Sequence, residues 1–566
     1  MRIRRNAIAG MIALLLSSAA AANEPPALHL ELTPRAQAGS VDLVQVNLRL
    51  QAPNVKAGEL LLRMPINLAG MPTAAYSAED ILAEDDGGPL ALRALDEPAN
   101  PSGRHRQYLV SRDTKGDVRV RYAGKPRVVD AQTRNGPLFD LRSEAGGALG
   151  AGVYFLALPP EKQVYRISLK WDLSQLPAGA RGVWSLGEGE QRTVGPAEML
   201  RFSLYAMGPV KSEPSEGKGN FGLYWLSPPP FDMPKLAADT QKLYRYMATF
   251  FDDTKSSYRV FARRNPYPAG GGTALAKSFV FGYGPNGESA STKDNQMLLA
   301  HEMAHNWPRM NGNDDHAGTA WYSEGTAEYY SAVLSYRAGV IGLDKFVKSI
   351  NSMAADYASN PHKNLSNDES GKIFWTDSRA QRVPYGRGFM YLARLNAQLK
   401  AKADKQRSLD DLVLEVQARQ RAGKQVGLAE WREMVTRELG PAAAAELDAM
   451  IAGKDIAPLP GAFGPCLKPV AYQLRPFDLG FDEMSLGVVK NLRAGSAAAA
   501  AGVKEGDQIV MAPDLVTAKD SDDRPLKLDV KRGEQRLTIS YIPRGAAVPA
   551  WRWERTADAA KGACKL

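Results

Sequence analysis

The stretch "AHEMAHNWPR" (residues 300–309) decides how this chain is interpreted. It places His301 and His305 four positions apart, with Glu302 between them and no helix-breaking residue before Pro308. Residues at i and i+4 share one face of a helix, so both imidazoles can reach one metal ion. Zinc favours such nitrogen ligands, and the intervening glutamate can then take a proton from bound water. The alternative interpretation is a pair of ordinary helix histidines.

A third ligand is predicted in the next helical stretch, "WYSEGTAEYY" (residues 321–330). Glu324 completes a set of two histidines and one carboxylate, which leaves one position on a zinc ion open for water. Glu328 follows one helical turn later, on the same face, and can accept the free N–H of a ligating histidine. The alternative for Glu328 is a solvated helix charge. We expect one Zn2+ per chain, bound by His301, His305 and Glu324.

These residues resemble the gluzincin metallopeptidases, in which HExxH is followed by a glutamate in a "W-x-x-E-G" setting. That clan includes aminopeptidase N, leukotriene A4 hydrolase and the glycyl aminopeptidase family. The stretch "VPYGRGFMYL" (residues 383–392) strengthens the resemblance, because these families carry a "Y-x-K-G" motif whose tyrosine stabilises the oxyanion. The resemblance implies that Glu302 and Tyr385 are catalytic. Arg387 stands where lysine is usual, and the two side chains are not equivalent if the position stacks or chelates.

Outside this region, the chain has the composition of an ordinary protein with several domains. It has 566 residues, 44% of them hydrophobic, and a formal net charge of +9 with basic residues scattered along the chain. The scatter argues against a nucleic-acid partner. Residues 1–22 combine an arginine-rich start, a short apolar run and a small-residue cleavage site, which predicts a secretory signal peptide rather than a membrane anchor. We therefore expect a periplasmic or secreted protein without a transmembrane segment in the mature chain.

Three regions follow the signal peptide, and together they predict a multidomain α+β chain. Residues 23–212 alternate apolar and polar positions in stretches such as "VDLVQVNLRLQ", which indicates an all-β domain. Residues 213–460 carry helical periodicity, with helices expected at 292–307, 320–338, 343–357, 386–403, 408–421, 428–437 and 441–452. The resemblance implies that this region is a mainly helical, thermolysin-like zinc peptidase domain. Residues 461–566 return to short strands after a Pro/Gly linker.

The C-terminal region resembles a PDZ domain in two stretches. "DLGF" (residues 478–481) is similar to the carboxylate-binding loop, which assigns Leu479, Gly480 and Phe481 to that loop. "VVKNLRAGSAAAAAGVKEGDQIV" (residues 488–510) follows the PDZ pattern of a short helix and a "G-D-x-I" turn. The resemblance implies a C-terminal peptide as a possible ligand of this domain. Taken with the metal motif and the β-rich first region, it points to the glycyl aminopeptidase family with a terminal PDZ domain.

The two cysteines of the chain, Cys466 and Cys564, bracket this last region. An isolated pair in an exported protein most often forms a disulfide, so we expect the two to be bonded. The alternative is two free thiols.

The stretch "GGGTALAKSF" (residues 270–279) departs from the aminopeptidase pattern. The resembled aminopeptidases carry a glutamate here that holds the free amine of the substrate, whereas this stretch has no acid, and Glu288 or another acid would have to take its place. Gly270, Gly271 and Gly272 are candidate substrate-binding residues, because a backbone without side chains lets a peptide approach. The strand "KSFVFGYG" after them could pair with substrate by β-addition. A plain glycine turn is the alternative.

The expected function is zinc-dependent hydrolysis of peptide bonds, with release of N-terminal residues preferred because of the resemblance. Two alternatives remain open: an endopeptidase that acts on unfolded envelope proteins, and a non-catalytic protein that binds through its PDZ domain. The presence of both Glu302 and Tyr385 weakens the second alternative. His316, in the loop between the two metal segments, is a further residue that could touch substrate.

Overall fold

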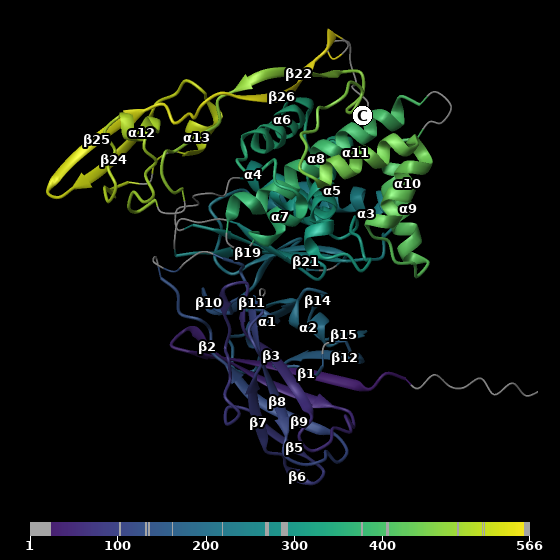
Figure 1. Ribbon diagram of the computed structural model, residues 1–566. Helices are drawn as coiled ribbons and strands as arrows, with labels where there is room; N and C mark the ends of the chain where they lie inside the picture. Colours follow the sequence, from purple (N-terminus) through teal and green to yellow (C-terminus); the bar gives the residue numbers. More distant parts are fainter. Residues whose placement is uncertain are drawn as a thin grey trace, which may run out of the picture. The chain divides into compact units, whose positions relative to one another are not determined.

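A computed structural model of the chain describes residues 24–566, except for 101–102, 131–132, 134–135, 161, 218, 267–270, 285–291, 375–376, 403–406, 484–485, 512, 514, 558 and 560–565. The predicted signal peptide therefore lies outside the described residues. The chain divides into two compact units, residues 1–210 and 211–566, which Figure 1 shows in purple to blue and in teal to yellow. No helix in the described part of the chain is long and apolar enough to cross a membrane.

The N-terminal unit is built from three β-sheets, in line with the alternating sequence. Its seven-stranded sheet has the order β15-β12-β1-β2-β9-β5-β6. The strands are β1 (Ala27–Gln37), β2 (Ser40–Leu50), β5 (Leu82–Asp85), β6 (Gly88–Pro89), β9 (Val118–Gly124), β12 (Val164–Trp171) and β15 (Gln191–Pro196). Alternate residues of β2, such as Val46 and Leu48, are buried, while Arg49 between Leu48 and Leu50 faces outward. One face of this sheet thus packs on the core, and the other carries polar side chains.

Two smaller sheets complete this unit. One has four strands in the order β4-β3-β8-β7, namely β3 (Leu60–Leu68), β4 (Met71–Pro72), β7 (Leu92–Asp96) and β8 (Gly103–Val110). The other has five in the order β10-β11-β16-β13-β14, namely β10 (Arg142–Glu144), β11 (Gly147–Ala151), β13 (Arg181–Trp184), β14 (Gly187–Glu188) and β16 (Leu204–Gly208). Two one-turn helices, α1 (Gly152–Phe155) and α2 (Glu198–Arg201), connect strands.

The second unit opens with a five-stranded sheet in the order β17-β18-β19-β21-β20. Its strands are β17 (Lys211–Glu213), β18 (Phe221–Trp225), β19 (Tyr258–Arg264), β20 (Gly272–Leu275) and β21 (Ser278–Tyr283). β21 is paired with β19 on one side and with β20 on the other. The expectation that the strand "KSFVFGYG" could pair with substrate by β-addition is therefore wrong, because both of its sides are occupied. The edge strand is β20, because the chain turns back at Ala276–Lys277 and pairs the glycine stretch with the strand that follows it.

Helices dominate the rest of this unit, close to the predicted ranges. They are α3 (Met233–Phe250), α4 (Thr292–Ala304), α5 (His316–Arg337), α6 (Leu343–Ser359), α7 (Asn367–Lys372), α8 (Ser378–Lys400), α9 (Leu409–Arg421), α10 (Leu428–Leu439) and α11 (Pro441–Ile451). Helix α4 ends three residues earlier than expected. Helix α8 begins at Ser378 rather than at 386 and keeps Pro384 inside it, with Asp377 capping its N-terminus. The predicted start at 386 lies after Pro384, and an interior proline usually breaks a helix.

The C-terminal region contains a long two-stranded ribbon and a small domain at its far end (Figure 1). The ribbon pairs β22 (Leu467–Leu474) with β26 (Val548–Arg555). The small domain contains β23 (Gln508–Ile509), β24 (Leu526–Arg532) and β25 (Gln535–Tyr541) with the short helices α12 (Ala497–Ala500) and α13 (Leu515–Asp520), around its own hydrophobic core. Cys466, at the start of the ribbon, is disulfide-bonded. Its predicted partner Cys564 lies outside the described residues, so the pairing of these two stays a prediction.

The base of the ribbon belongs to the core of the helical domain rather than to the small domain. Phe463 and Trp553 are each 1% exposed and lie in the same hydrophobic cluster as Phe389 of α8. The rings of Phe463 and Trp553 are 5.1 Å apart. Asn351 of α6 adds two hydrogen bonds to the backbone of Trp553, at 3.0 and 2.7 Å. The change from one core to the next therefore falls within the ribbon, beyond the predicted boundary at 460/461.

Candidate active site

The two histidines of the opening motif lie at the end of α4. His301 is in the last turn of the helix, and His305 follows in the turn immediately after Ala304. Their rings are 4.8 Å apart and nearly perpendicular, and their Nε2 atoms are 3.1 Å apart. Hydrophobic neighbours on the same segment, Met303 and Trp307, are buried and fix this end of the helix in the core. Both imidazoles thus present the same nitrogen to one point.

Glu324 of α5 faces that point. Its Oε2 atom lies 3.4 Å from Nε2 of His301 and 3.3 Å from Nε2 of His305. The ligand atoms of the three residues all lie within 4.8 Å of one another. Oε2 of Glu324 is buried and has no hydrogen-bond partner among the described residues. A buried carboxylate oxygen without a donor is costly, and a cation between it and two imidazole nitrogens would satisfy it, so these residues fit a zinc ion.

The electrostatics of the cluster agree with a cation site. Burial would raise the pKa of the Glu324 carboxyl, but His301 and His305 outweigh it and hold this pKa well below its usual range. Burial would likewise lower the pKa of His301, but Glu328 and Glu324 outweigh it and raise the pKa to about 9. In the metal-free protein His301 is therefore protonated at neutral pH. Binding of a metal must displace that proton, so affinity falls as the pH falls.

Two further side chains complete the site around this cluster. Glu302 is largely enclosed by protein, and burial raises the pKa of its carboxyl above the usual value. Tyr385 of α8 stacks on the His301 ring, with centroids 5.6 Å apart and planes 8° apart. Burial also raises the pKa of Tyr385 far above its usual value, so its hydroxyl stays protonated and can donate a hydrogen bond. The structure thus brings together the carboxyl of Glu302 and the phenol of Tyr385 beside the three candidate metal-binding residues.

Close helix packing places Tyr385 there. A Cβ atom on Gly325 of α5 would lie 2.4 Å from the Cα of Gly388 on α8, so only glycines allow these helices to approach so closely. Gly325 follows Glu324 directly, and Gly388 comes one turn after Tyr385. Gly386 makes a similar contact with Tyr357 of α6, where an added Cβ would lie 2.4 Å from the tyrosine Cβ. These contacts hold Glu324, Tyr385 and α6 close to one another.

Arg387 takes no part in this cluster of side chains. It is fully buried and donates to Asn367 Oδ1 at 2.5 Å, to the carbonyl of Lys363 at 3.0 Å and to that of Leu365. It therefore ties α8 to the segment before α7. The arginine at the position of the usual lysine has a structural role here, because the helix turns it away from Tyr385.

The predicted substrate-binding glycines lie at the sheet edge. Gly270 falls outside the described residues. Gly271 has φ +107°, a conformation that favours glycine, and Gly272 begins β20. A Cβ on Gly272 would lie 1.9 Å from the ring of Phe279, so this glycine makes room for an aromatic side chain of the neighbouring strand. Neither glycine contributes a charge that could hold an amine.

One acid in this region was missed by sequence reasoning. Asp356 of α6 precedes Tyr357, at the contact with Gly386, and its carboxylate has no hydrogen bond or ion pair within the described part of the chain. The side chain of Asp356 is exposed, but protein surrounds its base. Desolvation raises the pKa of its carboxyl above the usual value, and Glu328 raises it further, while Arg382 opposes this shift. Arg382 also stands 5.7 Å from the centre of the Tyr385 ring. In the sequence this aspartate resembles any solvated helix charge.

The remaining predicted residues are His316 and the loop residues Leu479, Gly480 and Phe481. His316 begins α5, is exposed, and packs edge-on against Phe374 at 4.8 Å, so it has a structural neighbour outside the cluster. Leu479 and Phe481 are buried in the core of the small domain, and Gly480 has φ +87°. The N–H of Gly480 donates to Oδ1 of Asp478 at 2.8 Å, so the loop's own carboxylate already occupies this amide.

Comparisons with known proteins agree with this geometry. Residues 294–385 match the family model of the M61 glycyl aminopeptidase. This range contains His301, His305 and Glu324 and their two neighbours, Glu302 and Tyr385. The crystal structure of an aminopeptidase N family protein from Idiomarina loihiensis superposes with a TM-score of 0.64 at 15% identity, covering 95% of this chain and 100% of that one. The chain shares that fold. The family match over the site residues supports peptide hydrolysis.

Other solved structures are more distant. An M1 zinc metallopeptidase mutant from Deinococcus radiodurans, bound to a Tyr-Ser-Ala substrate, gives a TM-score of 0.46 at 18% identity over 77% of this chain and 95% of that one. Yeast LTA4 hydrolase gives 0.47 at 14% identity over 77% and 69%. No curated protein matches the sequence.

Proposed function

We propose that this protein is a zinc-dependent peptidase that releases residues from the N-termini of peptides. The observation that carries the proposal is the convergence of His301, His305 and Glu324 on one point, beside Glu302 and Tyr385. The three ligands would hold zinc, which when bound polarises the scissile carbonyl and makes water more acidic.

The remaining chemistry belongs to the chain's own side chains. Glu302 takes the proton of the attacking water and passes it to the leaving amine, since it stands between the two histidines in the sequence and burial raises the pKa of its carboxyl above the usual value. Tyr385 donates its hydroxyl hydrogen to the oxygen that gains negative charge. Glu328 holds Nδ1 of His301, which orients the other nitrogen toward the metal position.

The edge strand β20 supplies a place for the substrate backbone. Among the residues that the structure describes, it pairs with β21 on one side only, so an extended peptide can add to its other side through main-chain hydrogen bonds. The absence of an acid in residues 270–279 leaves the substrate's amine without the partner expected from the resemblance. We assign that role to Asp356, whose unpaired carboxylate lies beside the helix contact that positions Tyr385.

An endopeptidase is the second candidate, favoured by the same missing acid. An enzyme that does not grip the amine would cleave blocked and free peptides equally. A purely binding role through the small domain has less support, because Gly480 already donates to Asp478 and the catalytic pair is complete. We also propose, from the signal-like residues 1–22, that the mature protein acts in the periplasm or outside the cell.

The decisive experiment compares zinc-loaded wild type with Glu302→Gln on free-amine and N-acetylated peptides. Glutamine keeps the size of the side chain but cannot take a proton, so we expect zinc content to be unchanged and kcat to fall by about 10²–10⁴-fold. Glu433→Gln, an exposed glutamate of α10, is the matched control. Near-normal turnover in Glu302→Gln, in protein freed of contaminating peptidases, would overturn the assignment.

A further inference from the structure

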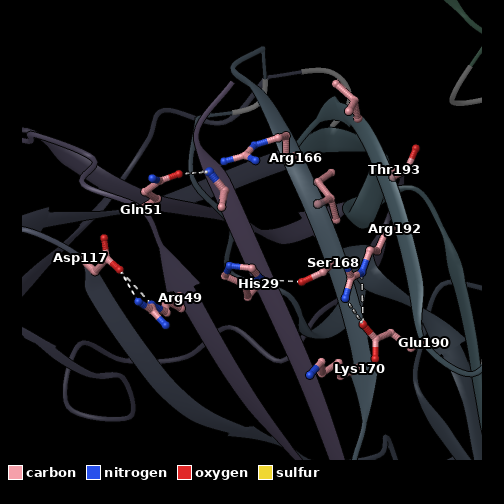
Figure 2. A pocket seen from close by; sticks show the side chains of 13 residues that line it. His29, Arg49, Gln51, Asp117, Arg166, Ser168, Lys170, Glu190, Arg192 and Thr193 are labelled. Atoms are coloured by element: carbon pink, nitrogen blue, oxygen red, sulfur yellow. Dashed lines mark hydrogen bonds and ion pairs between the residues drawn. The ribbon is translucent and has the colours of Figure 1, made fainter. Parts of the chain in front are cut away.

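The outward face of the seven-stranded sheet carries a hollow of about 720 Å3 in the N-terminal unit (Figure 2). Strands β15, β12, β1 and β2 line most of it. We call it the basic hollow, because four of its lining side chains are cationic and two are acidic: Arg49, Arg166, Lys170 and Arg192 against Asp117 and Glu190. It contains none of the residues of the metal cluster.

The strand register puts one neutral polar pair at the centre of these cations. His29 and Ser168 are directly opposite each other on β1 and β12, and Nδ1 of His29 lies 2.6 Å from Oγ of Ser168. Arg49 of β2 is directly opposite His29, and Arg192 of β15 is directly opposite Ser168. Arg166 and Lys170 stand two positions before and after Ser168, on the same face. The register thus gathers four cationic side chains around one neutral pair.

The acids of the hollow hold the arginines in place but leave donors free. Asp117 binds Arg49 through Nε and Nη2, at 2.9 and 2.7 Å. Glu190 binds Arg192 through the same two atoms, at 3.3 and 3.0 Å. The second Nη of each guanidinium has no partner in the described part of the chain. Figure 2 shows these two pairs on either side of His29.

The other two cations are less fully compensated. Arg166 contacts Glu24 through Nη1 at 2.9 Å and the carbonyl of Pro25 through Nε at 3.0 Å. Lys170 has no ion pair or hydrogen bond from its ammonium group among the described residues, although Glu31 is its cross-strand neighbour.

The field at the centre of the hollow is positive. Desolvation lowers the pKa of His29 first, and Arg49, Lys170 and Arg166 lower it further, while Asp117 opposes them. The imidazole is therefore neutral near pH 7. With the Ser168 hydroxyl donating to Nδ1, the Nε2–H is left as a donor toward the hollow.

We propose that the basic hollow binds the doubly charged oxyanion of a phosphate monoester. Arginine and lysine donors arranged around one point suit a tetrahedral group with two charges better than a single carboxylate. The hollow is larger than a bare oxyanion requires, and Val194, 60% exposed on its wall, offers an apolar contact to the organic part of a soluble ester. This site is independent of the peptidase proposal.

Calorimetric titration of the full-length protein at low ionic strength tests the site, with inorganic phosphate and glucose 1-phosphate as probes. We expect both to bind, the ester more tightly, and added salt to weaken both. Lys170→Met should weaken binding about 2- to 5-fold, as the loss of one exposed charge contact implies. The double variant Arg166→Gln with Lys170→Met should weaken it about tenfold.

Lys125→Met is the matched control, since Lys125 is exposed in the same unit but does not line the hollow. It should change affinity less than twofold. Equal loss in the control would mean non-specific attraction and overturn the proposal, as would absence of binding by both probes. Binding of phosphatidylglycerol vesicles without binding of either soluble probe would also overturn it, in favour of a membrane-facing surface. Unchanged circular dichroism of each variant excludes misfolding as the cause.

Discussion

His301 lies between two glutamates of the same helix: its Nδ1 is 3.4 Å from Oε1 of Glu328, and its Nε2 is 3.4 Å from Oε2 of Glu324. The two carboxylates are one turn apart on α5, so one helix supplies both a metal ligand and the group that fixes the tautomer of another ligand. A carboxylate that accepts the Nδ1–H of a histidine, as Glu328 can, makes the Nε2 atom of that imidazole a stronger ligand for a metal ion.

The first prediction tests that relationship. Glu328→Gln should lower zinc affinity by about 10- to 100-fold, because the partner of Nδ1 loses its charge while the three ligands remain. Competition with a chelator of known affinity measures the change. Glu433→Gln should leave zinc affinity unchanged, and an unchanged affinity in Glu328→Gln as well would assign Glu328 to a solvated surface role.

The second prediction concerns the ligands. His301→Ala should lose zinc, because two remaining donors do not fix a tetrahedral ion. Metal analysis after dialysis gives the answer directly. Full zinc occupancy in this variant would show that the ion, if present, binds elsewhere.

The third prediction concerns the oxyanion donor. Tyr385→Phe keeps the ring that stacks on His301 but removes the hydroxyl, so zinc should stay and kcat should fall by roughly 10²–10³-fold. KM should change little, since this contact forms mainly in the transition state. A change confined to KM would instead make Tyr385 a substrate-binding residue.

The fourth prediction separates exopeptidase from endopeptidase action. Asp356→Asn should reduce kcat/KM for free-amine peptides by roughly 10- to 150-fold, the value of a charged hydrogen bond of about 1.5–3 kcal/mol. Acetylated peptides should be unaffected. Asp368→Asn, at an exposed aspartate of α7, is the control. If wild type prefers free amines and Asp356→Asn keeps that preference, another residue holds the amine.

The fifth prediction follows from the core shared by the ribbon and the helical domain. Truncation of residues 461–566 should prevent folding, because it removes Phe463 and Trp553, and loss of one buried aromatic side chain alone costs about 3–5 kcal/mol. Leu474 and Val548 are cross-strand partners. Replacing 475–547 by an Asn-Gly turn should therefore remove only the small domain and keep zinc and short-peptide hydrolysis. A folded, zinc-loaded but inactive excision variant would show that the small domain shapes the active site.

A sixth effect is expected in the N-terminal unit. Arg63 binds Glu97 through two contacts of 2.7 Å, and this partner lowers the pKa of the Glu97 carboxyl to about 2, against burial. A lowered pKa contributes stability above the unfolded value of 4.5 and loses it as the pH falls toward 2. The contribution is at most about 3 kcal/mol at neutral pH.

Urea unfolding at pH 7, 4 and 3 measures this contribution. Glu97→Gln should destabilise the protein at pH 7, and the difference from wild type should shrink with each step downward. Glu79→Gln, at an exposed position of the same unit, should show no such trend. A difference that is independent of pH would mean that packing rather than charge is lost.

The sequence by itself determined the parts that depend on spacing along one chain segment. His301 and His305 share a face because four residues make about one helical turn, and Glu324 follows within the next helix. The strands β1, β2, β9 and β12 were recognisable because one sheet face meets the core and the other meets water. Tyr385 was found through its motif rather than through periodicity.

Only the tertiary structure decided the features that depend on contacts between distant segments. Pro384 stays inside α8, and α8 approaches α5 closely because Gly325 and Gly388 meet. Asp356 becomes notable only when α6 crosses α8 beside the metal cluster. The edge of the sheet is β20 rather than β21. Trp553 packs in a hydrophobic core whose other residues lie mostly in the helical domain, far earlier in the sequence. Such pairings are set by packing and burial of whole surfaces, which local periodicity does not encode.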